Sequence, residues 1–63
     1  MPWTPEYFPV AMRKLSEPVR LKAIAIANAL LASGTEEGMA IRIAIAKSRE
    51  WARHHGLPVH RDE

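Results

Sequence analysis

Apolar residues recur along two long stretches of the chain at steps of three and four positions, the spacing of one face of an α-helix. The first stripe consists of Val19, Ala23, Ile26, Ala27 and Leu30, widened by Ile24 and Leu31. The second stripe consists of Ala40, Ile41, Ala44, Ile45, Ser48, Trp51 and Ala52. We therefore predict an all-α fold built on two helices, over residues 17–32 and 36–54.

Residues that favour helix ends frame both stretches. Ser16 is suited to cap the first helix by accepting a hydrogen bond from an unpaired backbone N–H. Gly34 is placed to end that helix in a left-handed conformation, Thr35 to cap the second helix, and Gly56 to help end it. A linker as short as residues 33–34 predicts an antiparallel or steeply crossed helix pair.

An alternative interpretation as β-strands has to be weighed, because isoleucine alternates with other residues within Ala23–Ala27 and Ile41–Ala46. Helices remain the better interpretation. Alanine is the best helix former, both stretches carry end signals on each side, and no Asn-Gly or Asp-Gly hairpin turn is present.

The first nine residues include prolines at positions 2, 5 and 9, which predict an extended arm rather than a helix. The arm also carries three aromatic residues, Trp3, Tyr7 and Phe8. Because so many exposed rings would be costly, we expect the arm to be ordered and to lie across the helix pair.

The remaining segments are short. A helix is expected over residues 10–15, with Val10, Ala11 and Leu15 turned inward. Residues 56–63 are expected to form a flexible tail, and the 63 residues to form one small helical domain.

Several apolar residues of the two helices fall outside the inward stripes. They are Leu21, Ala25, Met39, Ile43 and Ala46. The arm can cover one side of the helix pair, and a second copy of the chain or another protein is a natural cover for the other. We therefore favour a non-enzymatic protein-interaction or self-associating module, with these residues as its candidate surface.

A basic stripe on the second helix supports a competing hypothesis, a small nucleic-acid-binding protein. The stripe consists of Arg42, Arg49 and Arg53, with Lys47 to one side. It would span roughly 16 Å at about 1.5 Å per residue. The formal net charge of +2 permits such a partner. Glu50 interrupts the stripe, and Glu36 and Glu37 lie at the helix end that usually enters a DNA groove. We therefore rank nucleic-acid binding below the protein-interaction module.

The chain is poor in groups that perform chemistry. It has no cysteine, its one aspartate is Asp62, and it has no glycine-rich phosphate loop. Glu50, His54, His55 and His60 come nearest to a metal-ligand set, but adjacent helical residues point about 100° apart. A polar helix end is the favoured interpretation, so we expect no enzyme, cofactor, metal ion or small-molecule substrate.

The N-terminus lacks the pattern of a secretory signal, and no apolar run approaches the roughly 20 residues of a membrane span. The absence of cysteine agrees with a reducing compartment. We therefore expect a cytoplasmic protein that does not contact membranes.

Several short sequences resemble a family of short uncharacterised bacterial proteins, the YdaT-like proteins. They are Met1-Pro2-Trp3 with Tyr7, Phe8 and Pro9, then residues 22–31, 37–41 and 47–52. The resemblance covers about residues 1 to 53, and the Met-Pro-Trp start and Glu-Trp-Ala end are its most specific parts. It implies a bacterial source and supplies no activity, cofactor or binding residue.

Overall fold

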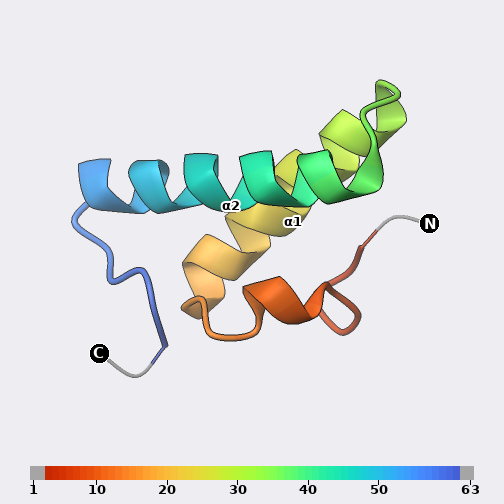
Figure 1. Ribbon diagram of the computed structural model, residues 1–63. Coiled ribbons are helices and arrows are strands. Elements are labelled where there is room, and N and C mark those ends of the chain that lie inside the picture. The colour runs from red at the N-terminus through yellow and green to blue at the C-terminus, as the bar shows by residue number, and fades with distance from the viewer. Residues whose placement is uncertain (1–2, 62–63) are drawn as a thin grey trace.

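The computed structural model describes residues 3–61 and arranges them around two crossed helices (Figure 1). A short 3-10 helix, η1 (Val10–Met12), precedes α1 (Glu17–Ala32) and α2 (Glu37–His54). α1 passes obliquely behind α2 in this view. The described residues contain no β-strand beyond isolated bridges, so the predicted all-α helix pair is confirmed.

The turn between the two long helices depends on Gly34. Its φ of +96° lies in the left-handed region that favours glycine, as predicted. The Gly34 and Thr35 N–H groups donate to the carbonyls of Leu31 and Leu30 at 3.0 and 2.9 Å. Carbonyls at the end of α1 are thereby paired, and the chain reverses within a few residues.

The residue that caps α2 is Glu36, one position later than the predicted Thr35. Its carboxylate accepts a hydrogen bond from the Met39 N–H at 3.0 Å. The N–H groups of Met39 and then Gly38 lower the pKa of Glu36 from its ordinary value of 4.5, and Arg42 adds a smaller effect in the same direction. The glutamate side chain is long enough to reach the first turn, so α2 starts at Glu37 and Thr35 stands before the cap.

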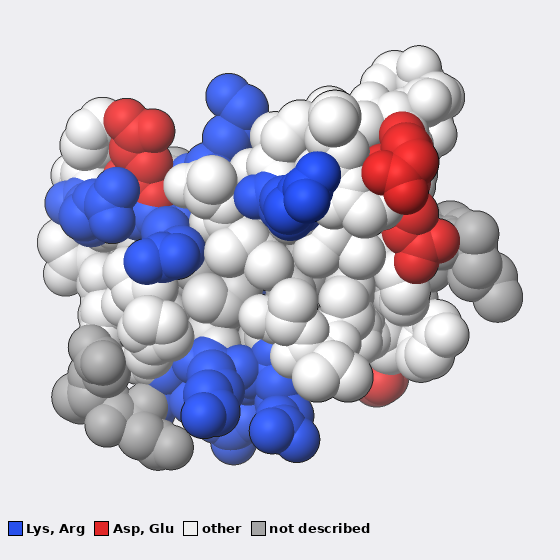
Figure 2. All heavy atoms as spheres, in the orientation of Figure 1, with Lys and Arg blue, Asp and Glu red and all other residues white. Residues whose placement is uncertain are grey.

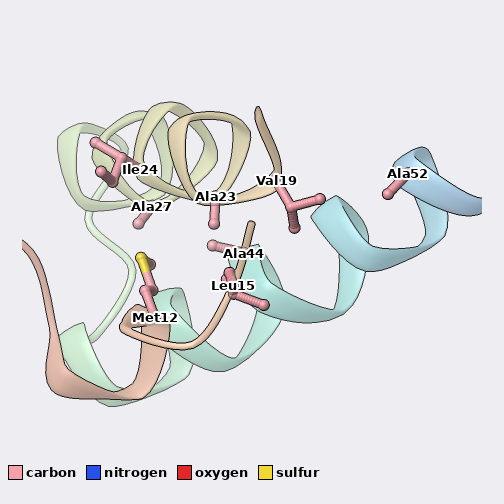
Figure 3. Packing of buried hydrophobic residues seen from close by; sticks show 8 residues of the cluster. All are labelled: Met12, Leu15, Val19, Ala23, Ile24, Ala27, Ala44 and Ala52. Atoms are coloured by element: carbon pink, nitrogen blue, oxygen red, sulfur yellow. The ribbon is translucent and has the colours of Figure 1, made fainter. Parts of the chain in front are cut away.

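The core combines small residues from the long helices with larger ones from the flanking segments. Its buried cluster consists of Met12, Leu15, Val19, Ala23, Ile24, Ala27, Ala44 and Ala52. Alanine at the helix contact lets the two axes approach closely. Figure 3 shows Met12 and Leu15 lying against the alanines of both helices. The two predicted stripes therefore face this core.

Asn28 of α1 fastens the segment that precedes η1. Its Oδ1 accepts a hydrogen bond from the Trp3 N–H at 2.7 Å, and its Nδ2 donates one to the Trp3 carbonyl at 2.8 Å. Trp3 and Phe8 pack against the buried cluster. Thr4 and Tyr7 exchange two backbone hydrogen bonds, so the segment contains a tight turn and is not extended throughout. The first two residues of the predicted arm lie outside the described range.

The short helix predicted over residues 10–15 is reduced to the single turn of η1. Val10 and Ala11, expected to face inward, are exposed, whereas Met12 is fully buried. Leu15 is buried as expected. A single turn is too short to establish a periodic face, so tertiary packing decided which side chain turns inward. The flexible methionine fills the space between the helices.

After α2 the chain returns to the segment between η1 and α1 and pairs with it. We call residues 13–16 together with residues 58–61 the terminal clasp. Its hydrogen bonds run from Ser16 N to Val59 O (2.8 Å), from Arg61 N to Lys14 O (2.9 Å) and from Ser16 Oγ to Pro58 O (2.7 Å). Leu15 and His60 form an isolated antiparallel bridge.

The clasp corrects two expectations. Residues 57–61 are not a flexible tail, because Leu57 and Val59 pack against the core and the backbone is hydrogen-bonded; residues 62–63 lie outside the described range. Ser16 occupies the N-cap position of α1, but its hydroxyl makes no cap hydrogen bond. The hydroxyl donates to the Pro58 carbonyl instead, joining the segment before α1 to the segment after α2.

Candidate interaction surfaces

The side chains that suggested metal or acid-base chemistry do not come together. His55 lies with its Nδ1 2.9 Å from the Trp51 carbonyl oxygen and its ring 5.0 Å from the Trp51 ring. His60 is part of the terminal clasp, away from the end of α2. Within residues 3–61, no group of three or more His, Asp or Glu side chains could hold a metal ion. In the same range, neither long helix has the length and apolar character needed to cross a membrane.

An apolar surface lies on the outward side of α1. We call it the α1 outer face; it consists of Pro18, Leu21, Ala25, Ala29 and Ala32, all exposed. These positions follow each other at steps of three and four, opposite the buried side of the helix. The face spans about 21 Å at about 1.5 Å per residue.

The α1 outer face carries no charge along its length. Lys22 is the last charged residue of α1. Its ammonium group lies 5.4 Å from the centre of the Trp51 ring and is therefore turned toward α2. The second half of α1 offers only apolar side chains and Asn28 to its surroundings, and Asn28 is occupied by Trp3.

The residues predicted as one interaction surface fall on different sides of the molecule. Leu21, which is 41% exposed, and Ala25 belong to the α1 outer face. Met39, which is 47% exposed, and Ala46 lie on the outward side of α2, and Ile43 is half-buried beside them. The structure therefore divides these candidates into two separate surfaces.

The basic residues predicted on α2 are all exposed, and three of them share one side of the helix. At about 100° per residue, positions 42, 49 and 53 fall within roughly 40° of one another. We call Arg42, Arg49 and Arg53 the α2 arginine face; Lys47 lies farther around the helix. Figure 2 shows basic side chains along α2, with acidic ones near the start of that helix and also beside the basic ones toward its end.

A second basic group, missed by the sequence analysis, lies at the terminal clasp. The Leu15–His60 bridge and the Arg61 N–H to Lys14 carbonyl bond place Lys14 directly opposite Arg61. Directly opposed residues of an antiparallel pair point to the same side. Both side chains are exposed, as is the neighbouring Arg13. We call Arg13, Lys14 and Arg61 the clasp basic cluster.

The signal that could have indicated an extended segment in this part of the chain was the alternation of Leu57 and Val59 with Pro58 and His60. It does not reveal which segment lies opposite. The basic cluster therefore depends on a pairing between residues more than forty positions apart, as the Ser16 to Pro58 bond illustrates.

Comparison with known proteins gives one informative match. The chain is 50% identical over 54 residues, or 86% of its length, to the uncharacterized protein YdaT of Bacillus subtilis (strain 168). This identity confirms the resemblance to the YdaT-like proteins. The chain spans 36% of the length of YdaT, and the name of that relative assigns no activity. No protein-family model and no solved structure matches the chain.

Proposed function

We propose that this domain is a non-enzymatic interaction module, and that its α1 outer face packs against the same face of a second copy of the chain. The observation that carries the proposal is the continuous, uncharged apolar surface along α1. A helix with apolar side chains on nearly all sides is usually buried on nearly all sides, by the rest of its own chain or by a partner.

The α1 outer face suits a neighbouring helix because its side chains are small. Three of its five members are alanine, which lets a second helix approach to about 8 Å between axes. Leu21 is the one large side chain on it. A partner helix would need a small residue opposite that leucine.

A second copy meets this requirement by symmetry. Ala25 lies at the middle of the face, so two antiparallel copies related by a two-fold axis would cross near it. Leu21 of each copy would then lie opposite the small Ala29 of the other. The face is complementary to itself, which supports a homodimer over an unrelated partner.

The association should be weak and concentration-dependent, because the fold does not need it. A compact monomer of this mass is expected to expose about 4,100 Å², and the chain exposes 4291 Å². A stable interface buries about 800 Å² per partner, which is more than one face of a single helix of 16 residues provides.

Sedimentation equilibrium over a wide concentration range tests this proposal. The wild type should approach twice its monomer mass as concentration rises, whereas Ala25→Glu should remain a monomer because it buries two charges at the crossing point. Ala46→Glu is the matched control, since it places the same charge on an exposed alanine of α2. A strictly monomeric wild type, or loss of association in Ala46→Glu only, would contradict the proposal.

A further inference from the structure

We infer that the clasp basic cluster, formed by Arg13, Lys14 and Arg61, binds the phosphate backbone of nucleic acid. The α2 arginine face extends the same binding surface. This inference does not depend on the proposed dimer, because its residues lie outside the α1 outer face.

The cluster brings three positively charged side chains together on one side of the clasp. Lys14 and Arg61 are directly opposed in the clasp, an arrangement that destabilises a strand pair. Within the described part of the chain, no carboxylate forms an ion pair with Arg13, Lys14 or Arg61. The clasp is held by backbone bonds, by the Ser16 hydroxyl and by one bond from Arg61 Nη1 to the Arg13 carbonyl at 3.4 Å, and the Lys14 side chain takes no part in these bonds. A bound phosphate would relieve the repulsion through charge-assisted hydrogen bonds.

Two groups of basic side chains are visible on one face of the molecule. Figure 2 shows one along α2 and the other below it, over the segments that precede α1 and follow α2. A single phosphate or carboxylate could contact one group only. A chain of regularly spaced phosphates can contact both at once, and this favours nucleic acid as the ligand.

An anionic membrane surface is the less suitable partner. Binding to it requires large apolar side chains grouped with the basic ones. The large apolar side chains that are most exposed lie in four different segments: Tyr7 before η1, Val10 in η1, Leu21 in α1 and Met39 in α2.

The salt dependence of binding distinguishes phosphate contacts from other interactions. Each neutralised phosphate contributes about −0.9 to the slope of log K against log salt for duplex DNA, and about −0.7 for single strands. Removal of two contacts should therefore make the slope shallower by about 1.8 on duplex DNA, and should weaken binding on the order of tenfold per contact at low salt.

The test is fluorescence anisotropy with labelled duplex and single-stranded DNA of generic sequence, between about 50 and about 200 mM salt. The full chain is used, because the acidic residues Asp62 and Glu63 follow Arg61 in the sequence and their charges oppose that of the cluster. The Lys14→Gln plus Arg61→Gln variant removes two contacts, and Lys14→Gln alone is compared with Lys22→Gln, which removes the same charge from an exposed lysine outside the cluster and outside α2. We expect the slope to change in both cluster variants and to stay near the wild-type value in Lys22→Gln.

Three results would overturn the inference: no DNA binding by the wild type at low salt, an equal loss in Lys14→Gln and Lys22→Gln, or binding to vesicles of anionic lipid without binding to DNA. Circular dichroism checks that each variant is folded. If the double variant unfolds, Lys14→Gln alone gives the answer, because the exposed Lys14 contributes only its backbone carbonyl to the clasp. Its slope should change by about half as much.

Discussion

Replacement of Asn28 by alanine should detach the N-terminal segment from α1 while leaving the helix pair folded. The Asn28 amide makes both hydrogen bonds that join it to Trp3, at 2.7 and 2.8 Å. No other side chain of α1 makes a hydrogen bond to residues 3–9 in the described structure. The indole of Trp3 would then lose its fixed position against the core, whereas the Phe8 ring keeps its contact with the Arg20 guanidinium, 5.0 Å from the ring centre.

The size of the effect follows from these two bonds. Each half-buried hydrogen bond contributes about 0.5–1.5 kcal/mol, so Asn28→Ala should cost roughly 2 kcal/mol. A domain of 63 residues has a total stability of about 3–9 kcal/mol. The Tm should fall by roughly 8–16 °C, since about 1 kcal/mol shifts the Tm of so small a domain by about 4–8 °C.

Amide hydrogen exchange measured by NMR reports directly on the contact. The Trp3 N–H donates to Asn28 in the wild type and should exchange slowly, whereas in Asn28→Ala it should exchange as fast as an exposed amide. Ser33→Ala serves as the control, because it removes an exposed side-chain hydrogen bond, to the Leu30 carbonyl, that does not involve residues 3–9. That control should change stability by less than about 0.5 kcal/mol.

The reasoning would be refuted by an Asn28→Ala variant with wild-type stability and wild-type exchange of the Trp3 amide. A large loss of helix content in that variant would also refute it, because it would show that the arm is required for the helix pair to fold.

Three further substitutions test the fold. Met12→Ala should cost about 2–5 kcal/mol, because Met12 is fully buried in the core cluster, and urea unfolding should show a variant close to the limit of stability. Gly34→Val should lower stability by about 1 kcal/mol or more, since a φ of +96° strains a β-branched residue although the space around it is open; an unchanged Tm would contradict this. The lowered pKa of Glu36 implies stability that is present above about pH 4.5 and lost as the pH falls through the lower folded value. The Tm of Glu36→Gln should therefore lack the part of the decline at acid pH that protonation of Glu36 causes. Superimposable curves of Tm against pH for the wild type and the variant would exclude this contribution of Glu36.

The long helices could be predicted from the sequence because their determinants are local. The apolar stripes, the Pro18 start and the Gly34 turn each act within a few residues along the chain. The cap of α2 was misplaced by one residue because Thr35 and Glu36 can both cap a helix start, and the choice depends on where the first turn packs.

The candidate surfaces were predictable only in part. Helical spacing identified Leu21 and Ala25 as outward residues of α1, and it placed three arginines on one side of α2. It could not show that Met39 and Ala46 would lie on another side of the molecule, because periodicity fixes a face of one helix and not its position relative to a second helix.

By itself, the sequence determined which residues form the two long helices, where the chain reverses between them and which side of each faces inward, since these depend on interactions between near neighbours. The tertiary structure alone decided that Asn28 holds Trp3, that Met12 rather than Val10 fills the core, and that the C-terminal segment pairs with residues 13–16. These contacts join residues far apart in the sequence, and they depend on the helix pair to bring its flanking segments close together. The clasp basic cluster exists for that reason.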